Sequence, residues 1–255
     1  MIFNITSTKN DKFKYFKNLK QKKFRTEEYT VEGKKSVLEA LNSKRKVTSL
    51  IMSKSFVTDF EIPENLPCYI IPISLFEQLS STDTPSGIIC TIKIEKNADF
   101  TPDLNKAYIY CDKISDPGNL GTIIRTADAA GFGGVLLSPG CVELYNPKTV
   151  RSSMGSFFHM DIIENITHEN IAAFKESGFQ ILSGVLNDKT VEYTSVDMTI
   201  PTIIVIGNES NGVSDEIISL SSKCIKIPII GDAESLNAAI AAAVIMYELL
   251  RQRNI

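Results

Sequence analysis

The 255-residue sequence has no tryptophan, only two histidines, and five cysteines that lie far apart and form no C-x-x-C pair. The cysteine pattern argues against a disulfide framework and a zinc site, and it is typical of a protein in a reducing cytoplasm. His159 and His168 lack the spacing of metal ligands, so we expect no bound metal. No apolar run approaches the roughly 20 residues of a membrane helix, and the N-terminus lacks the apolar core of a secretory signal.

Two nucleotide-binding fingerprints are also missing. The glycines of 131-GFGG-134 do not form G-x-G-x-x-G, and they end a predicted helix instead of opening one. No G-x-x-x-x-G-K-[ST] sequence is present either. These absences argue against a nicotinamide-dependent oxidoreductase and against a P-loop enzyme.

The net charge of −3 hides a strong asymmetry along the chain. Residues 1–54 carry 14 Lys and Arg against 5 Asp and Glu, whereas residues 55–255 carry 13 against 25. Within the basic part, lysines alternate with five aromatic residues, which are Phe13, Tyr15, Phe16, Phe24 and Tyr29. This mixture is typical of an RNA-contacting segment, because lysines neutralise phosphates and rings stack on bases. A solvated helix face would also explain the charge, and the sequence leaves both interpretations open.

Apolar patterning divides the chain into two parts. In the first part we expect a short strand before Gly33, a helix from Gly33, strands at 47–52, 68–71 and 87–94, and a helix at 75–79. A polar stretch without periodicity follows, so we predict a substrate-binding domain over 1–97, a linker over 98–106 and a second domain over 107–255.

The second part alternates strands with helical stretches. We predict strands at 107–112, 134–138, 179–185, 202–207 and 224–229, and a long Ala-rich helix at 235–252. This alternation indicates an α/β fold with a mostly parallel sheet. Ligands of such sheets bind beyond the carboxyl ends of the strands, so three loops in that position deserve comparison.

The first of these loops is 112-DKISDPGNLGTIIR-125. It leads from a strand through turn residues into a helix predicted over 120–130, with Arg125 near its middle. The neighbours of Arg125 in this helix are Ile and Ala, so we expect the helix to be packed on most sides. The arginine must then point to a partner or into a cleft.

The second and third loops are 207-GNESNG-212 and 227-IPIIGDAESLN-237. Gly207 would let a ligand approach the backbone, and the acid Glu209 stands at a strand's carboxyl end. In the third loop we expect Ser235 to cap the last helix and Asn237 to lie in its first turn, where free N–H groups gather.

With these three loops, the chain resembles the SpoU-type (TrmH-like) branch of the SPOUT RNA methyltransferases. The motif N-x-G-x-x-x-R is present as 119-NLGTIIR-125, G-N-E-x-x-G as 207-GNESNG-212, and I-P followed by S-L-N as 227-IPIIGDAESLN-237. The block 147-PKTVRSSMGSFF-158 resembles a further family segment. The stretch 31-VEGKKSVLEAL-41 is similar to the family's small α/β/α RNA-binding domain.

The resemblance implies methylation of a ribose 2′-hydroxyl with S-adenosyl-L-methionine, by a homodimer whose second domain contains a deep trefoil knot. It assigns Arg125 as the catalytic arginine, with Asn119, Glu209, Ser235 and Asn237 beside it. The cofactor contacts it implies are Gly184, Gly207, Ile227 and Leu236, and the RNA phosphate contacts are Lys148 and Arg151.

A guanidinium with a pKa above about 12 is a poor general base, so we expect Arg125 to hold a phosphate and stabilise the developing alkoxide. The additional N-terminal domain favours ribosomal RNA as the substrate. The alternatives are a tRNA 2′-O-methyltransferase and a non-catalytic dimeric RNA-binding protein.

Overall fold

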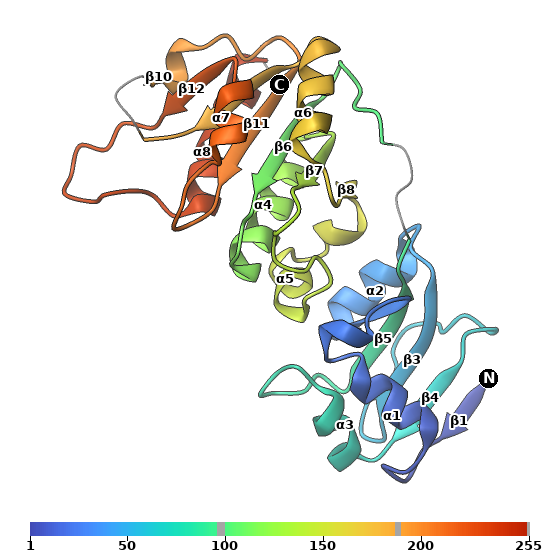
Figure 1. Cartoon of the computed structure of the whole chain (residues 1–255). Helices are drawn as coiled ribbons and strands as arrows, with labels where there is room; N and C mark the ends of the chain where they lie inside the picture. The colour runs from blue at the N-terminus through green and yellow to red at the C-terminus, as the bar shows by residue number, and fades with distance from the viewer. Residues whose placement is uncertain (96–99, 187–189, 254–255) are drawn as a thin grey trace. The chain divides into compact units, whose positions relative to one another are not determined.

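The computed structural model describes residues 1–95, 100–186 and 190–253 (Figure 1). The chain forms two compact units. Unit 1 comprises Met1–Lys96 together with Tyr145–Phe158, and unit 2 comprises Asn97–Leu144 together with His159–Ile255. The predicted boundary between residues 97 and 98 lies outside the described residues. Within the described ranges, no helix is long and apolar enough to cross a membrane.

Unit 1 is built on a five-stranded mixed sheet with the order β1-β4-β3-β5-β2. Its strands are β1 (Ile2–Asn4), β2 (Glu28–Glu32), β3 (Val47–Ser53), β4 (Cys68–Ile71) and β5 (Ile88–Lys93). Strands β1, β4 and β3 are parallel, and β5 runs antiparallel to both β3 and β2. Three of these strands reproduce the predicted ranges closely, but β1 was not predicted.

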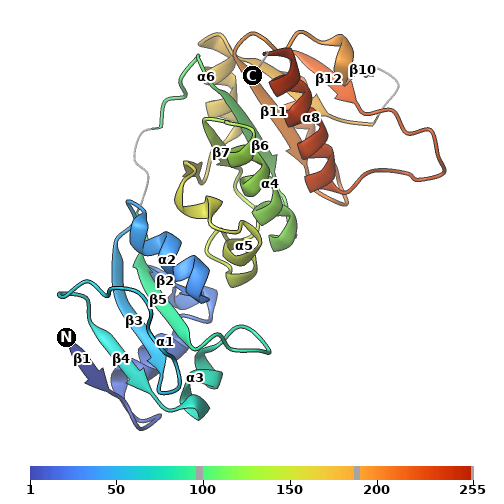
Figure 2. The same ribbon diagram turned by 180° about the vertical axis from the view of Figure 1, so that it is seen from behind.

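Helices cover both faces of this sheet (Figures 1 and 2). Helices α1 (Asp11–Asn18) and α3 (Ile73–Leu79) bury Phe13, Phe16 and Phe76 in a core shared with strand residues such as Ile51 and Ile71. Helix α2 (Lys34–Asn42) contacts β2 and β5. The predicted α/β/α fold of the N-terminal part is therefore confirmed.

A segment from later in the sequence completes unit 1. Helix α5 (Pro147–Ser152) contacts β2, and the 3₁₀ turn η2 (Ser156–Phe158) follows it. The ring of Tyr29 on β2 lies 4.6 Å from that of Tyr145 and 5.8 Å from that of Phe157, measured between centroids. These aromatic contacts explain why residues 145–158 belong to unit 1, although the sequence division placed them in the second domain.

Unit 2 contains a seven-stranded sheet with the order β10-β12-β9-β11-β6-β7-β8, in which every described pair is parallel. Its strands are β6 (Ala107–Asp112), β7 (Gly134–Leu137), β8 (Ile162–Ile163), β9 (Gln180–Gly184), β10 (Val191–Glu192), β11 (Thr202–Gly207) and β12 (Lys223–Lys226). The central strands β6 and β11 are almost wholly buried, as expected for a parallel sheet covered on both faces. The predicted, mostly parallel α/β architecture is confirmed.

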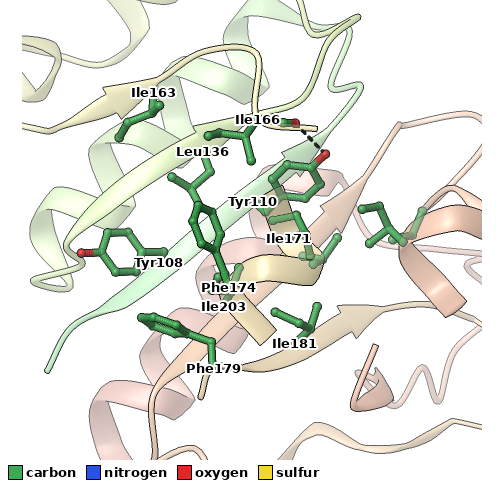
Figure 3. Packing of buried hydrophobic residues seen from close by; sticks show 13 residues of the cluster. Tyr108, Tyr110, Leu136, Ile163, Ile166, Ile171, Phe174, Phe179, Ile181 and Ile203 are labelled. Atoms are coloured by element: carbon green, nitrogen blue, oxygen red, sulfur yellow. Dashed lines mark hydrogen bonds between the residues drawn. The ribbon is translucent and has the colours of Figure 1, made fainter. Parts of the chain in front are cut away.

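The alternation of side chains along the strands supplies two cores. Tyr108, Tyr110 and Val205 point to one face, where they pack against α6 (His168–Glu176) and α7 (Asp215–Leu220) through residues such as Phe174 (Figure 3). The phenol of Tyr110 donates to the carbonyl of Ile166 at 3.1 Å, which satisfies the buried hydroxyl. Helices α4 (Pro117–Ala129) and α8 (Ala238–Gln252) lie side by side on the other face (Figure 2).

Candidate functional site

The predicted loops meet at the carboxyl edge of the sheet in unit 2. Gly207, the last residue of β11, is in register with Asp112, the last residue of β6, so both strands end at the same level. Strands β9 and β12 lie on the other side of β11, and Gly184 pairs with Ile225. Because all these strands are parallel, the segments that follow them emerge at one edge.

Glu209 joins the β11 loop to the loop that follows β6. Its carboxylate accepts four hydrogen bonds: from Ser115 N at 3.0 Å, Ser115 Oγ at 2.7 Å, Asp116 N at 3.1 Å and Asn119 Nδ2 at 2.8 Å. Burial by itself would raise the pKa of this carboxyl, but the hydrogen bonds from Asn119 and Ser115 outweigh it and lower the pKa to about 2. Glu209 is therefore a carboxylate at neutral pH, and its acceptor positions are filled.

Asn119 connects Glu209 to the third loop. Its backbone N–H donates to the helix cap Asp116 at 2.8 Å, its Nδ2 donates to Glu209, and its Oδ1 accepts from Asn237 Nδ2 at 2.9 Å. One hydrogen-bonded chain therefore links residues from the three motifs, and its two bonds join residues that are 90 and 118 positions apart in the sequence.

The expected role of Ser235 as a helix cap is wrong. Helix α8 begins at Ala238, and Asn237 is its N-cap: Asn237 Oδ1 accepts from Ala239 N at 2.9 Å and from Ile240 N at 3.2 Å. Asn and Ser are about equally good caps, so residue preference alone did not distinguish the two positions. The structure also explains the asparagine, which serves as the cap and does not lie within the first turn.

Gly207 is required for a different reason from the one that the sequence suggested. A Cβ at this position would lie 2.2 Å from the backbone of Gly212 and Val213, so the loop itself folds back onto the glycine. Asn208 closes this loop: its Oδ1 accepts from Ser210 N at 3.0 Å, and its Nδ2 donates to the carbonyl of Lys113 at 2.7 Å. The expected close approach to Gly207 is thus made by the backbone of Gly212 and Val213.

A cavity of about 650 Å³ opens between the ends of β9 and β11 and the start of α8. All four residues predicted to contact a cofactor line it, namely Gly184, Gly207, Ile227 and Leu236. Ser235, Asn237 and Glu209 line it as well. Apolar side chains such as Ile206 and Ile245 line the cavity together with polar and charged ones such as Asn208 and Lys226, and such a mixed lining suits a small polar molecule.

Arg125 lies outside this hydrogen-bonded chain. Six residues of helix separate it from Asn119, which places it about 9 Å further along the axis and about 120° around it. Helix α4 buries Leu120, Ile123 and Ile124 on its inner face, and Arg125 is exposed on the outer one. No hydrogen bond or ion pair of its guanidinium is present in the described part of the chain. The helix is thus packed on one side only, and the described residues contain no partner of the kind expected for the arginine.

Lys148 and Arg151 are both exposed on α5, in unit 1. Arg151 Nη1 donates to Ser81 Oγ at 3.4 Å. Their contact with RNA phosphates stays a prediction. His159 and His168 are exposed, and His168 Nε2 lies 3.0 Å from a carboxylate oxygen of Glu169.

Sequence reasoning missed two residues that hold the site together. Ser115 gives Glu209 two of its four hydrogen bonds, and Asn208 anchors the β11 loop to the backbone after β6. Ser115 directly precedes the cap Asp116, a position where short polar side chains commonly serve the local backbone, so its long-range partner had no local signal.

Comparison with known proteins agrees with this geometry. Residues 106–247 match the SpoU rRNA Methylase family, and residues 10–90 match the MRM3-like substrate binding domain. The chain is 33% identical over 249 residues to the 23S rRNA (guanosine(2553)-2′-O)-methyltransferase RlmP of Bacillus subtilis, covering 96% of this chain and 98% of that protein. It is 35% identical over 147 residues to the tRNA (guanosine(18)-2′-O)-methyltransferase of Aquifex aeolicus, covering 57% of this chain and 69% of that protein.

A solved structure with the same fold is the AdoMet-bound rRNA methyltransferase from Sinorhizobium meliloti. It matches with a TM-score of 0.87 and 29% identity, over 98% of both chains. The family match spans the segment that contains the three loops, and the RlmP match spans almost the whole chain. On these grounds, the chain belongs to the SpoU rRNA Methylase family.

Proposed function

We propose that this protein transfers the methyl group of S-adenosyl-L-methionine to a ribose 2′-hydroxyl of RNA. The observation that carries the proposal is the hydrogen-bonded chain from Glu209 through Asn119 to Asn237, whose two end residues line the cavity. The helix that contains Asn119 also presents an exposed arginine to solvent. The site thus combines a small-molecule pocket with a cation free to meet an anionic substrate.

The cavity suits the proposed cofactor. Its volume of about 650 Å³ lies in the usual range for small-molecule sites, and its lining mixes apolar side chains with asparagine, serine and glycine. We propose Gly184, Gly207, Ile227 and Leu236 as its contacts, with Ser235 and Asn237 at the polar end. When bound, S-adenosyl-L-methionine supplies an electrophilic methyl group on a sulfonium.

Ribosomal RNA is the substrate class that we propose. The B. subtilis relative that matches over nearly its whole length is named for 23S rRNA, and the N-terminal unit matches a substrate binding domain. The tRNA enzyme matches only the C-terminal part of this chain, so a tRNA substrate is the second candidate.

In the proposed reaction the 2′-oxygen forms a bond to the methyl carbon, the carbon–sulfur bond breaks, and its electron pair stays on sulfur. The hydroxyl proton is released to water. Arg125 would grip the adjacent phosphate and stabilise the negative charge that develops on the 2′-oxygen, since an arginine is an improbable proton acceptor. Glu209, with a pKa of about 2, is likewise a poor base at neutral pH. It positions Asn119 and the loop after β6.

The direct test is Arg125→Ala, assayed for methyl transfer to unmodified 23S rRNA and, separately, for S-adenosyl-L-methionine binding by calorimetry. We expect transfer to fall at least 100-fold, because oxyanion-type stabilisation of this kind is usually worth that much, while cofactor affinity stays within twofold. Lys223→Ala removes an exposed cation from β12 of the same unit and serves as the matched control. Transfer by Arg125→Ala at the wild-type rate would exclude the assigned role.

We also propose that the active form is a knotted homodimer, as the resemblance implies. The exposed apolar side chains on α8 support the dimer, since Ile240 is 52% and Tyr247 50% exposed. They are seven positions apart and thus share one helix face. In such a dimer the partner subunit would supply hydrogen-bond partners that the guanidinium of Arg125 lacks among the described residues of one chain. We further propose the cytoplasm as its location, on the five free cysteines.

A further inference from the structure

The basic segment over residues 9–25 contains cations that are hydrogen-bonded within unit 1 and cations that face solvent. One kind is used internally. Lys20 Nζ donates to two carbonyls at and just after the end of α3, at 3.1 and 2.6 Å. Arg25 Nη1 donates to the carbonyls of Leu19 and Lys20 at 2.8 and 2.9 Å. The bonds of Lys20 connect the turn after α1 to the end of α3, and those of Arg25 stabilise the turn itself. Both cations therefore bind carbonyls of unit 1, although the sequence alone would have assigned them to RNA.

The inner side of α1 is fixed equally firmly. Phe13 and Phe16 are buried in the core beneath the sheet, and Asn10 caps the helix by accepting from Lys12 N and Phe13 N. The orientation of α1 is therefore set by packing, and its outward face is defined before any ligand binds. Such preorganisation lowers the entropic cost of binding.

Two exposed rings lie in this segment, one on α1 and one on the turn that follows, each with an ammonium group beside it. Tyr15 is 37% and Phe24 40% exposed. Lys12 Nζ lies 5.4 Å from the centroid of the Tyr15 ring, and Lys23 Nζ lies 4.9 Å from that of Phe24, which lies in the 3₁₀ turn η1 (Lys22–Phe24). Within the described residues, the ammonium groups of Lys9 and Lys22 have no hydrogen bond or ion pair.

Tyr15 is held in place by its own hydroxyl. The phenol donates to Glu28 Oε2 at 2.6 Å, across 13 positions of sequence. Burial, followed by the bond to Glu28, raises the pKa of Tyr15, so the phenol stays protonated and adds no charge that would repel a phosphate. The ring is thus a fixed, neutral surface next to a cation.

Single exposed apolar side chains are ordinary on protein surfaces and need no explanation. Here, however, two exposed rings lie in the most cationic part of a chain whose residues 55–255 have an excess of acidic groups. We propose that the outward face of α1 and η1, formed by Lys12, Tyr15, Lys22, Lys23 and Phe24 together with Lys9 two residues before α1, is a binding surface for single-stranded RNA. This α1–η1 face stacks bases on its two rings and neutralises phosphates with its lysines.

The chemistry favours an unpaired strand over a duplex. In a duplex the faces of the bases are covered by their neighbours, so rings have nothing to stack on, whereas a loop or unpaired segment exposes them. Lysines alone would bind either form through phosphates. The two rings therefore give the surface its selectivity. The inference rests on the proposed function, which makes RNA the substrate, and it adds where and in which form part of that RNA is bound.

The test measures the affinity of the full chain for two fluorescent probes, a 12-nucleotide oligouridine and a 12-base-pair RNA duplex of unrelated sequence. We expect Phe24→Leu to bind oligouridine about tenfold more weakly, because stacking on a ring contributes about that factor per base, whereas Phe24→Tyr should retain binding within twofold. Binding of the duplex should change less than twofold in both variants.

Salt dependence tests the lysines. In the double variant Lys9→Ala, Lys22→Ala, the slope of log affinity against log salt for oligouridine should fall by about 1.4, since each phosphate contact to a single strand contributes about 0.7. Lys54→Ala is the matched control, because Lys54 is an exposed lysine of unit 1 that lies outside this face. Its salt slope should equal that of the wild type.

Two outcomes would overturn the proposal. Equal oligouridine affinity of wild type and Phe24→Leu would exclude stacking, and an unchanged salt slope in the double lysine variant would exclude phosphate contact at this face. Because the substituted side chains are exposed, melting temperatures should stay at the wild-type value. Methyl transfer by the wild type to 23S rRNA is measured in parallel: if it is absent while the face still binds oligouridine, the proposed function fails and this surface stands.

Discussion

Glu209 illustrates how the chemistry of a single residue depends on the groups that point toward it. Its side chain is exposed, yet four donors from the loop after β6 and the start of α4 converge on it. A carboxylate in that setting holds its donors in place and does not accept a proton at pH 7. Glu209, which sequence reasoning placed beside Arg125, therefore holds Asn119 and the loop after β6.

Replacing this carboxylate should cost stability in a pH-dependent way. In Glu209→Gln, an amide N–H₂ faces groups that are themselves donors, so we expect a loss of about 1 kcal/mol in unfolding free energy at pH 7. The folded-state pKa of about 2 is below the ordinary value of 4.5, so the wild-type contribution is complete above about pH 4.5 and is lost as pH falls toward about 2. Urea unfolding of both proteins at pH 7, 4 and 3 measures the difference.

Glu176→Gln is the control, since Glu176 is an exposed carboxylate on α6 of the same unit. The difference in unfolding free energy between this control and the wild type should be the same at all three pH values. If the difference in unfolding free energy between Glu209→Gln and the wild type stays constant from pH 7 to pH 3, hydrogen bonds of the folded state do not lower the pKa of Glu209.

At the scale of elements, the strand ranges were the most predictable feature. Strands β4, β6 and β11 have the ranges predicted for them. In β6 and β11 the signal is clear because a strand buried on both faces is apolar along nearly its whole length. By contrast, α1 alternates lysines with aromatic residues, and β1 is three residues long and exposed. Their apolar signal is too short to separate from a solvated segment, so the sequence analysis did not define them.

The start of α8 allows a test at the element scale. Asn237→Ala removes the cap and the bond to Asn119, and should lower the unfolding free energy by about 1 to 2 kcal/mol. Asn237→Asp keeps an acceptor for the helix N–H groups but has no donor for Asn119 Oδ1. It should recover much of the stability while methyl transfer remains reduced. Thermal unfolding and a methyl-transfer assay distinguish the two effects.

Ser235→Ala tests the sequence prediction that Ser235 caps the last helix. If Ser235 capped the helix, this substitution would cost as much as Asn237→Ala. In the structure its side chain makes no capping bond, so the variant should melt within about 1 °C of the wild type. A large drop for Ser235→Ala would show that the helix starts elsewhere in solution.

At the scale of the whole molecule, the order of residues in the chain differs from their grouping in space. Residues 145–158 lie in the second part of the sequence, but they pack on β2 of unit 1 through Tyr145 and Phe157. A division based on sequence assumes that each domain is a continuous segment, so it places these residues with their chain neighbours. Tyr29 lies more than a hundred positions before Tyr145 and Phe157 in the sequence, and no local pattern encodes a contact between residues so far apart.

The proposed dimer is tested at this scale as well. Wild type should sediment at twice the chain mass of 28.2 kDa. The double variant Ile240→Glu, Tyr247→Glu should sediment as a monomer, because it places two charges on the exposed apolar face of α8. Ala173→Glu, at an exposed position on α6, is the control that should keep the wild-type mass. A wild-type monomer in sedimentation velocity at micromolar concentration would contradict the dimer.

The sequence by itself determined the secondary-structure pattern of the sheet and the place of the three loops, because apolar periodicity and turn chemistry act over a few residues. The residues expected to contact the cofactor came from the resemblance of those loops to the SpoU-type family. The tertiary structure alone decided that Glu209, Asn119 and Asn237 form one hydrogen-bonded chain, that Asn237 caps α8, and that residues 145–158 belong to unit 1. It also decided which lysines of the basic segment support the fold and which face solvent. Those properties depend on contacts between distant segments, which exist only after the sheet has brought its loops to one edge.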